Sequence, residues 1–248
     1  MRTALHVIGS FALFVYFAGT FDYVSANASD SEACPASRIE PEKVLHRKFI
    51  ASTIGLDPQI RKSAAKATIE QTRKSLEADE NNLEQHYLHI IALGAYARAS
   101  STKESMAERL GSKSKKAIEK LEILAPDKPW TDTLHGVWHI EAERRGGFLA
   151  SMLLGASKER GVEYLEKAME ADKYDAAIPF VYATALFAGY AKKESERGLQ
   201  LISDIKERLK ACSDEVAGAA IKKYTQQFEE LLLAKKTKEL EELAQKLM

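Results

Sequence analysis

The stretch that decides the fold is Ser157-Lys-Glu-Arg-Gly-Val-Glu-Tyr-Leu-Glu-Lys-Ala-Met-Glu-Ala-Asp172. Gly161, Leu165 and Ala168 recur in it at helical spacing, so they lie on one face of a predicted helix. The same period continues through the chain beyond residue 38, and no long stretch alternates between polar and apolar residues as a β-strand would. The sequence therefore predicts an all-α protein.

About nine helices are predicted, joined by short connections, which is the pattern of antiparallel helical hairpins. Asp57 fits an N-cap, and Pro58 follows it in the first turn of a helix. The predicted helices span about Glu42–Ser52, Pro58–Ala78, Leu83–Ala99, Lys103–Leu124, Trp130–Arg145, Ser157–Ala171, Ala176–Ala191, Glu194–Ala211 and Asp214–Leu247.

Three of these helices end in similar strings, which close on Asp79, Asp127 and Asp172 at spacings of 48 and 45 residues. This recurrence resembles the tetratricopeptide repeat (TPR), over roughly residues 60–211. The resemblance implies an α-α superhelix, a TPR-like solenoid of helical hairpins. In that arrangement the terminal helix, Asp214–Leu247, shields the end of the array. It also implies a protein- or peptide-binding scaffold or adaptor.

The composition excludes several classes of protein. The chain has 248 residues, of which 45% are hydrophobic, enough for a packed core and too many for a mainly disordered chain. Its 36 basic and 36 acidic residues give no net positive field for a nucleic-acid partner. The chain contains no P-loop, G-x-G-x-x-G or G-x-S-x-G motif, so we predict that it is not an enzyme and needs no cofactor.

Residues 1–28 are expected to form a cleaved secretory signal peptide. Arg2 precedes a 12-residue apolar run, Val7–Ala18, and Ala26-Asn27-Ala28 has the small residues that a signal peptidase accepts. Export to the bacterial periplasm, or secretion, is therefore predicted, with no membrane contact after cleavage. The alternative is an uncleaved N-terminal helix that anchors the protein.

Export bears on the two cysteines, Cys34 and Cys212, because both would then lie in an oxidising compartment. They form a disulfide or stay as two thiols, and the sequence does not decide between these outcomes. The predicted division of the chain is a signal peptide at 1–28, a tail and first helix at 29–57, helical repeats at 58–211 and a cap at 212–248.

The candidate binding site is centred on one predicted helix. His135 and His139, with Glu143, are spaced to share a helix face and could hold a metal ion, but they could equally pack between helices. Packing is the expected role, and no metal is predicted. Trp130 and Trp138 lie on the same helix and could form an interaction site or fill the core.

A glycine-bracketed apolar insertion follows this helix. Residues 147–156 (GFLASMLLGA) could form a lid that lines a pocket or partner groove, or could simply enlarge the core. The leading functional hypothesis is a non-enzymatic scaffold for an unidentified protein or peptide. The alternative is a periplasmic small-ligand or metal-binding protein with a pocket near His135, Trp138 and His139. The candidate ligand-binding residues are Trp130, His135, Trp138 and His139. A hydrolase with an atypical site in the same cleft is a third hypothesis.

Overall fold

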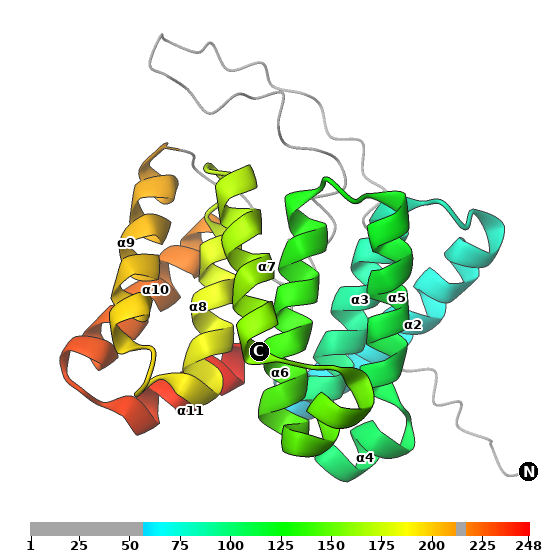
Figure 1. The fold of residues 1–248 in the computed structure, drawn as a ribbon, viewed down its shortest axis with the longest axis horizontal. Coiled ribbons are helices and arrows are strands. Elements are labelled where there is room, and N and C mark those ends of the chain that lie inside the picture. Colours follow the sequence, from blue (N-terminus) through cyan, green and yellow to red (C-terminus); the bar gives the residue numbers. More distant parts are fainter. Residues whose placement is uncertain (1–56, 212–216) are drawn as a thin grey trace, which may run out of the picture. The chain divides into compact units, whose positions relative to one another are not determined.

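The predicted all-α architecture is confirmed by a computed structural model, which describes residues 57–211 and 217–248. This part of the chain contains ten helices and no strand (Figure 1). The helices are α2 (Pro58–Ala78), α3 (Leu83–Arg98), α4 (Thr102–Ala107), α5 (Leu110–Leu124), α6 (Pro129–Leu154), α7 (Lys158–Ala171), α8 (Ala177–Tyr190), α9 (Ser195–Ala211), α10 (Gly218–Leu233) and α11 (Thr237–Leu247). The predicted signal peptide, the predicted helix at residues 42–52, Cys34 and Cys212 lie outside the described residues.

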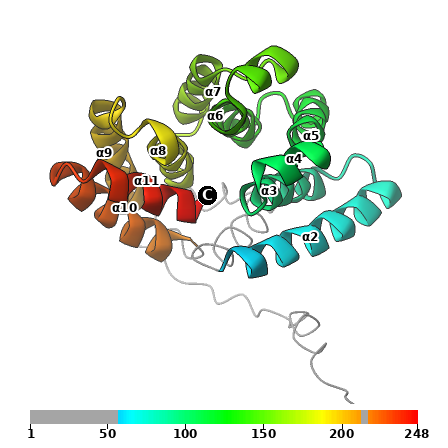
Figure 2. The same ribbon diagram turned by 90° about the horizontal axis from the view of Figure 1, so that it is seen from below.

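Consecutive helices pack against each other along the array. The pairs α2–α3, α6–α7, α8–α9 and α10–α11 are in contact, and α5 packs on both α3 and α6. Helix α11 then returns to pack on α8, which Figure 2 shows from below. The C-terminal helices therefore lie against the middle of the array as well as at its end.

Side-chain caps define the starts of several helices. Asp57 accepts a hydrogen bond from the Gln59 main-chain N–H at 2.8 Å, as expected for the N-cap of α2. Asn82 caps α3 in the same way, with its Oδ1 accepting from Gln85 N–H at 3.1 Å. Local hydrogen bonding thus places helix boundaries where the sequence predicts them.

Three predicted helices differ from the structure. The helix expected at Lys103–Leu124 is two helices, α4 and α5, because Arg109 between them is left-handed with φ of 54°. The single helix expected at Asp214–Leu247 is also divided, into α10 and α11, and Lys235 in the connection again has φ of 54°. Left-handed backbone is rare for a residue with a side chain. Because the left-handed residues here are arginine and lysine rather than glycine, the sequence does not reveal either break.

The third difference is the length of α6. The helix expected to end at Arg145 resumes after a break at Gly147, where φ is 53° and ψ is −140°, and continues to Leu154. Glycine tolerates this conformation because it has no Cβ. Gly155, with φ of 70°, then terminates α6 with a left-handed C-cap. The apolar insertion is therefore a short helical extension at an angle to the rest of α6.

The core is closely packed where α6 crosses α7. A Cβ added to Gly136 would lie 2.7 Å from the carbonyl oxygen of Gly161 and 2.6 Å from Leu165 Cγ. The two helices can approach this closely only because both positions are glycine. Within the described ranges, no helix combines the length and hydrophobicity needed to cross a membrane.

Candidate functional site

A cavity of about 460 Å³ lies between the helices of the described region. Its walls come mainly from α3, α5, α6 and α8, and most of its lining side chains are apolar. The larger apolar residues of the wall are Ile90, Ile91, Ile118, Trp130, Leu134, Val137, Trp138, Phe180 and Val181. The volume falls within the range of about 300–1,000 Å³ that is typical of small-molecule sites.

The two tryptophans of the predicted site, Trp130 and Trp138, both line this cavity. Trp130 donates its indole N–H to Asp175 Oδ2 at 2.8 Å, and Trp138 donates its own to the Gly111 carbonyl oxygen at 3.1 Å. Both side chains are also buried. Because each indole N–H already has a protein partner, the rings present apolar surface to the cavity and need no polar group on a ligand.

Exposed apolar residues mark the opening of the cavity. Met106, Leu149 and Leu153 line the cavity, yet each is exposed, Leu153 by 69%. They belong to α4 and to the extension of α6 beyond Gly147, which lie at the same end of the helices in Figure 1. The insertion thus has the position of a lid beside the pocket, one of the two roles that the sequence leaves open.

Arginines dominate the charge of the cavity wall. Arg61, Arg98, Arg109 and Arg145 line it, from α2, α3, the α4–α5 connection and α6, and Glu141 is the single acidic residue among the described residues of the wall. Basic side chains therefore outnumber acidic ones among the described residues of the wall. The Glu141 carboxylate is moreover held at 2.8 Å by both Nε and Nη2 of Arg144, which is not part of the wall.

Burial and neighbouring positive charges lower the pKa values of three of these arginines. Burial lowers the pKa of Arg98 to about 10, and the positive charges of Arg61, Arg145 and Arg144 lower it further, while Glu141 opposes the shift. Burial likewise lowers the pKa of Arg61 and of Arg145. A pKa of about 10 keeps Arg98 protonated at neutral pH, so this part of the wall carries a charged group.

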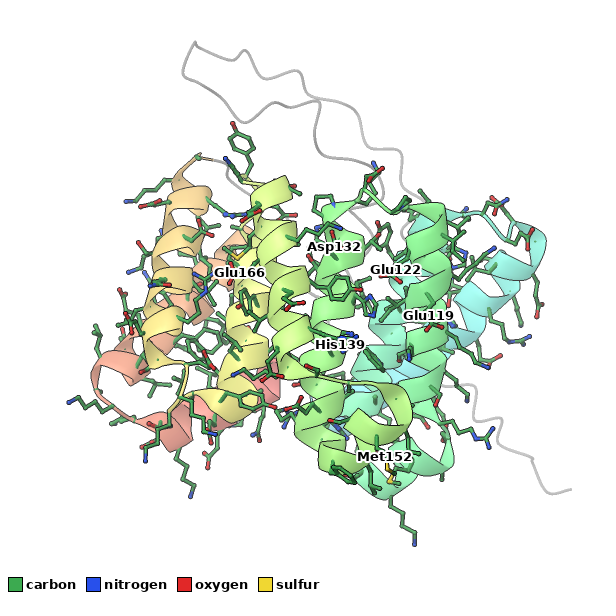
Figure 3. All side chains as sticks on the ribbon, viewed as in Figure 1. Glu119, Glu122, Asp132, His139, Met152 and Glu166 are labelled. Carbon is green, nitrogen blue, oxygen red and sulfur yellow. The ribbon has the colours of Figure 1, made fainter. Side chains whose placement is uncertain are left out.

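The two histidines of the predicted site, His135 and His139, are buried at the contact of α6 with α5 and α7 and are not among the cavity-lining residues. The His135 ring stacks on His139 and on Tyr164, with centroid distances of 4.8 and 4.2 Å. His135 Nδ1 lies 2.6 Å from Glu122 Oε1. Figure 3 shows Glu122 near Asp132, from α5 and α6. The structure therefore divides the predicted four-residue site: the tryptophans line the cavity and the histidines do not.

The geometry does not support a metal site at these histidines. His139 Nδ1 accepts a hydrogen bond from the Ser157 main-chain N–H at 3.2 Å, so it is engaged. Glu143 Oε2 accepts from the Lys158 main-chain N–H at 2.6 Å. No group of three histidine, cysteine or carboxylate side chains among the described residues could hold a metal ion. Burial and the charge of His135 lower the pKa of His139 to about 4, which keeps it neutral.

The arginine cluster is the feature that sequence reasoning missed. Arg61, Arg98 and Arg145 are separated by 37 and 47 residues and belong to three helices, so no local motif joins them. A helical pattern shows which face of one helix is apolar but not which faces of distant helices meet.

No family model, curated protein or solved structure matches the chain. Function must therefore be argued from the cavity.

Proposed function

We propose that the protein binds a small, mainly apolar molecule in the cavity between α3, α5, α6 and α8, as a binding protein rather than an enzyme. The observation that carries the proposal is the cavity itself, with a volume of about 460 Å³ and walls that include Trp138, Ile118 and Phe180. An apolar pocket of this volume that opens to solvent is the usual form of a small-molecule site.

The wall favours binding without covalent chemistry. The two tryptophan N–H groups have protein partners, and the histidines lie outside the lining. Apolar contact contributes about 25 cal/mol for each Å² of surface removed from water, so it supplies affinity without a reactive group. The exposed apolar residues at the opening, Met106, Leu149 and Leu153, would contact a ligand as it enters.

Fluorescence of N-phenylnaphthylamine, a neutral apolar dye that brightens in apolar surroundings, tests this proposal. We expect saturable binding of about one dye per chain, and at least a tenfold loss of affinity in Ala142→Phe, which adds a ring at the cavity wall. Ala78→Phe is the matched control, because Ala78 is an exposed residue outside the lining. Absence of saturable binding to the intact protein would refute the proposal.

A second candidate function is the protein- or peptide-binding scaffold that the TPR resemblance implies. The specific observation in its favour is the exposed apolar surface of Phe148, Leu149, Met152 and Leu153, since such patches often mark partner-binding sites. Crosslinking from an envelope fraction, with Phe148→Ser/Met152→Ser as the comparison, tests it. These two residues are not in the cavity lining, so their replacement separates partner binding from ligand binding.

We also propose a periplasmic location, on the basis of the signal-like residues 1–28. Fractionation of cells that produce the full chain tests it, with N-terminal sequencing of the recovered protein. A mature N-terminus at residue 29 is expected, and recovery with the cytoplasmic fraction would contradict the proposal.

A further inference from the structure

We infer that one end of the helices docks on an anionic lipid membrane. This docking end carries α4 and the extension of α6 beyond Gly147. The inference goes beyond the proposed function, because it concerns the outer surface and a different partner, and it departs from the sequence-based prediction of no membrane contact. It is carried by two features of this end, an exposed apolar patch and an excess of exposed basic residues.

The apolar patch gathers on two short stretches of helix. Phe148 is 78% exposed and Leu153 is 69% exposed on the extension of α6, and Met106 is 60% exposed on α4. Leu149 and Met152 are also exposed on the same extension. Single exposed apolar residues are common on any protein, whereas several together at one place mark an interaction surface.

Four connections between helices share the docking end with this patch. Successive helices alternate in direction in Figure 1, so every second connection falls at the end that carries α4. These connections are residues 99–109, which include α4, and residues 155–157, 191–194 and 234–236. Figure 2 shows the same end from below.

Basic residues predominate in these connections. All of them are exposed, and they are Lys103, Arg109, Lys192, Lys193, Lys235 and Lys236. The same connections contain only three acidic residues. At the opposite end the described connections, residues 79–82, 125–128 and 172–176, have the reverse balance, with five acidic and two basic residues. The described helices therefore have a basic end and an acidic end, although the chain as a whole is neutral.

The acidic residues of the docking end are already paired. Glu104 and Glu108 form ion pairs with lysines of α2, and Glu194 pairs with Lys158 of α7. Each of the three glutamates is also only partly exposed. The charge that this end presents to solvent is therefore mainly positive, and a bilayer that contains anionic lipids attracts such a surface.

A lipid surface fits the apolar patch and the basic residues together. It offers anionic head groups to the lysines and apolar chains to Phe148 and its neighbours. A second copy of the protein fits less well, because two basic ends would face each other and like charges oppose association. Met106, Leu149 and Leu153 also line the cavity, so the patch is continuous with the cavity wall. An apolar molecule would pass from lipid to cavity without crossing water.

Quenching of tryptophan fluorescence by brominated lipid, which requires close contact, tests the inference. Phe148→Trp places a reporter in the patch. Ile123→Trp is the matched control, because Ile123 is 77% exposed on α5 and lies outside the patch and the cavity lining. The parent protein gives the background from the buried Trp130 and Trp138. With vesicles of brominated phosphatidylcholine and phosphatidylglycerol in equal parts, we expect quenching of the added fluorescence in Phe148→Trp and none in Ile123→Trp. Each reporter responds at its own position, so lipid contact elsewhere on the chain does not affect the comparison.

Vesicle flotation tests the contribution of charge. Lys103 lies three residues before Met106 on α4, so the two share a helix face. Lys103→Gln should weaken binding to vesicles that contain phosphatidylglycerol about fivefold, the contribution of one basic residue near an anionic surface. Lys173→Gln, an exposed lysine in a connection at the opposite end, is the matched control and should leave binding unchanged. Binding of the parent should also fall in about 1 M salt, where the Debye length is about 3 Å.

The possible results separate this inference from the others. Absence of quenching in Phe148→Trp, or equal quenching in Ile123→Trp, would overturn it. Equal binding of the parent to vesicles with and without phosphatidylglycerol would also overturn it, because the basic residues would then be irrelevant. If a crosslinked protein partner depends on Phe148 and Met152 while vesicles quench neither reporter, the patch belongs to that partner and the inference is wrong. N-phenylnaphthylamine binding is measured without vesicles, so failure of the lipid test leaves the proposed function standing.

Discussion

Replacement of Arg98 by methionine should raise the stability of the protein. Burial and three neighbouring arginines lower the pKa of Arg98 from 12.5 to about 10. This lowering of the pKa corresponds to about 3 kcal/mol of unfavourable energy for the charged side chain, at about 1.36 kcal/mol for each tenfold change in the acid dissociation constant. The substitution also removes the hydrogen bond to Met248, worth about 1.5–3 kcal/mol for a charged donor.

The two terms leave a net gain on the order of 1 kcal/mol. For a protein of this size, that gain raises the melting temperature by about 2–4 °C. The size of this gain in stability depends on pH. Because the folded pKa is below the unfolded pKa, the penalty is fully present below about pH 10 and declines between about pH 10 and 12.5. The difference between variant and parent should therefore be constant around pH 7 and shrink above pH 10.

Differential scanning calorimetry at pH 7 without added ligand measures the effect. Arg160→Met is the control, and as an exposed substitution it should change stability by less than about 0.5 kcal/mol. A melting temperature that falls in Arg98→Met, with Arg160→Met unchanged, would show that Arg98 stabilises the ligand-free fold. The reasoning from the lowered pKa of Arg98 would then be wrong.

Two further predictions concern the contacts of α6. Gly136→Ala should destabilise the protein by about 3 kcal/mol and lower the melting temperature by about 6–12 °C, since its Cβ would collide with the Gly161 carbonyl; Gly111→Ala, which would meet only the tip of a leucine, is the control. His139→Gln should flatten the acid stability profile. The folded pKa of His139, about 4 against 6.5, makes the parent lose up to about 3 kcal/mol as the pH falls between those values, whereas the variant should not, as urea unfolding at each pH would show.

The helical pattern was sufficient to predict most of the fold. The bounds of α2 match the prediction, and α3, α7, α8 and α9 begin and end within about one residue of it. Apolar spacing and capping residues such as Asp57 are local, so they can be recognised in one sequence. The breaks at Arg109 and Lys235 could not be predicted, because each has a left-handed backbone but is not a glycine. Tertiary packing imposes such a conformation against the local preference.

The site was predictable only in part, because the sequence does not show which helices come into contact. Trp130 and Trp138 belong to one helix and stand out by their size, and both line the cavity. His135 and His139 have the spacing of metal ligands, but their partners come from other helices, Glu122 on α5 and the Ser157 main chain before α7. Spacing along one helix shows that two side chains share a face and does not show what that face meets.

The zero net charge of the chain does not describe the local charge at the arginines of the cavity wall. A sum over 36 basic and 36 acidic residues describes the field far from the molecule, where a long polyanion such as a nucleic acid would be attracted. Near the cavity the field depends on the charged side chains of the wall, because buried charges are poorly screened. Arg61 is only 7% exposed, so a phosphate backbone cannot reach it from outside. Neutral composition thus argues against a nucleic-acid partner and does not describe the local charges of the cavity wall, where four arginines lie.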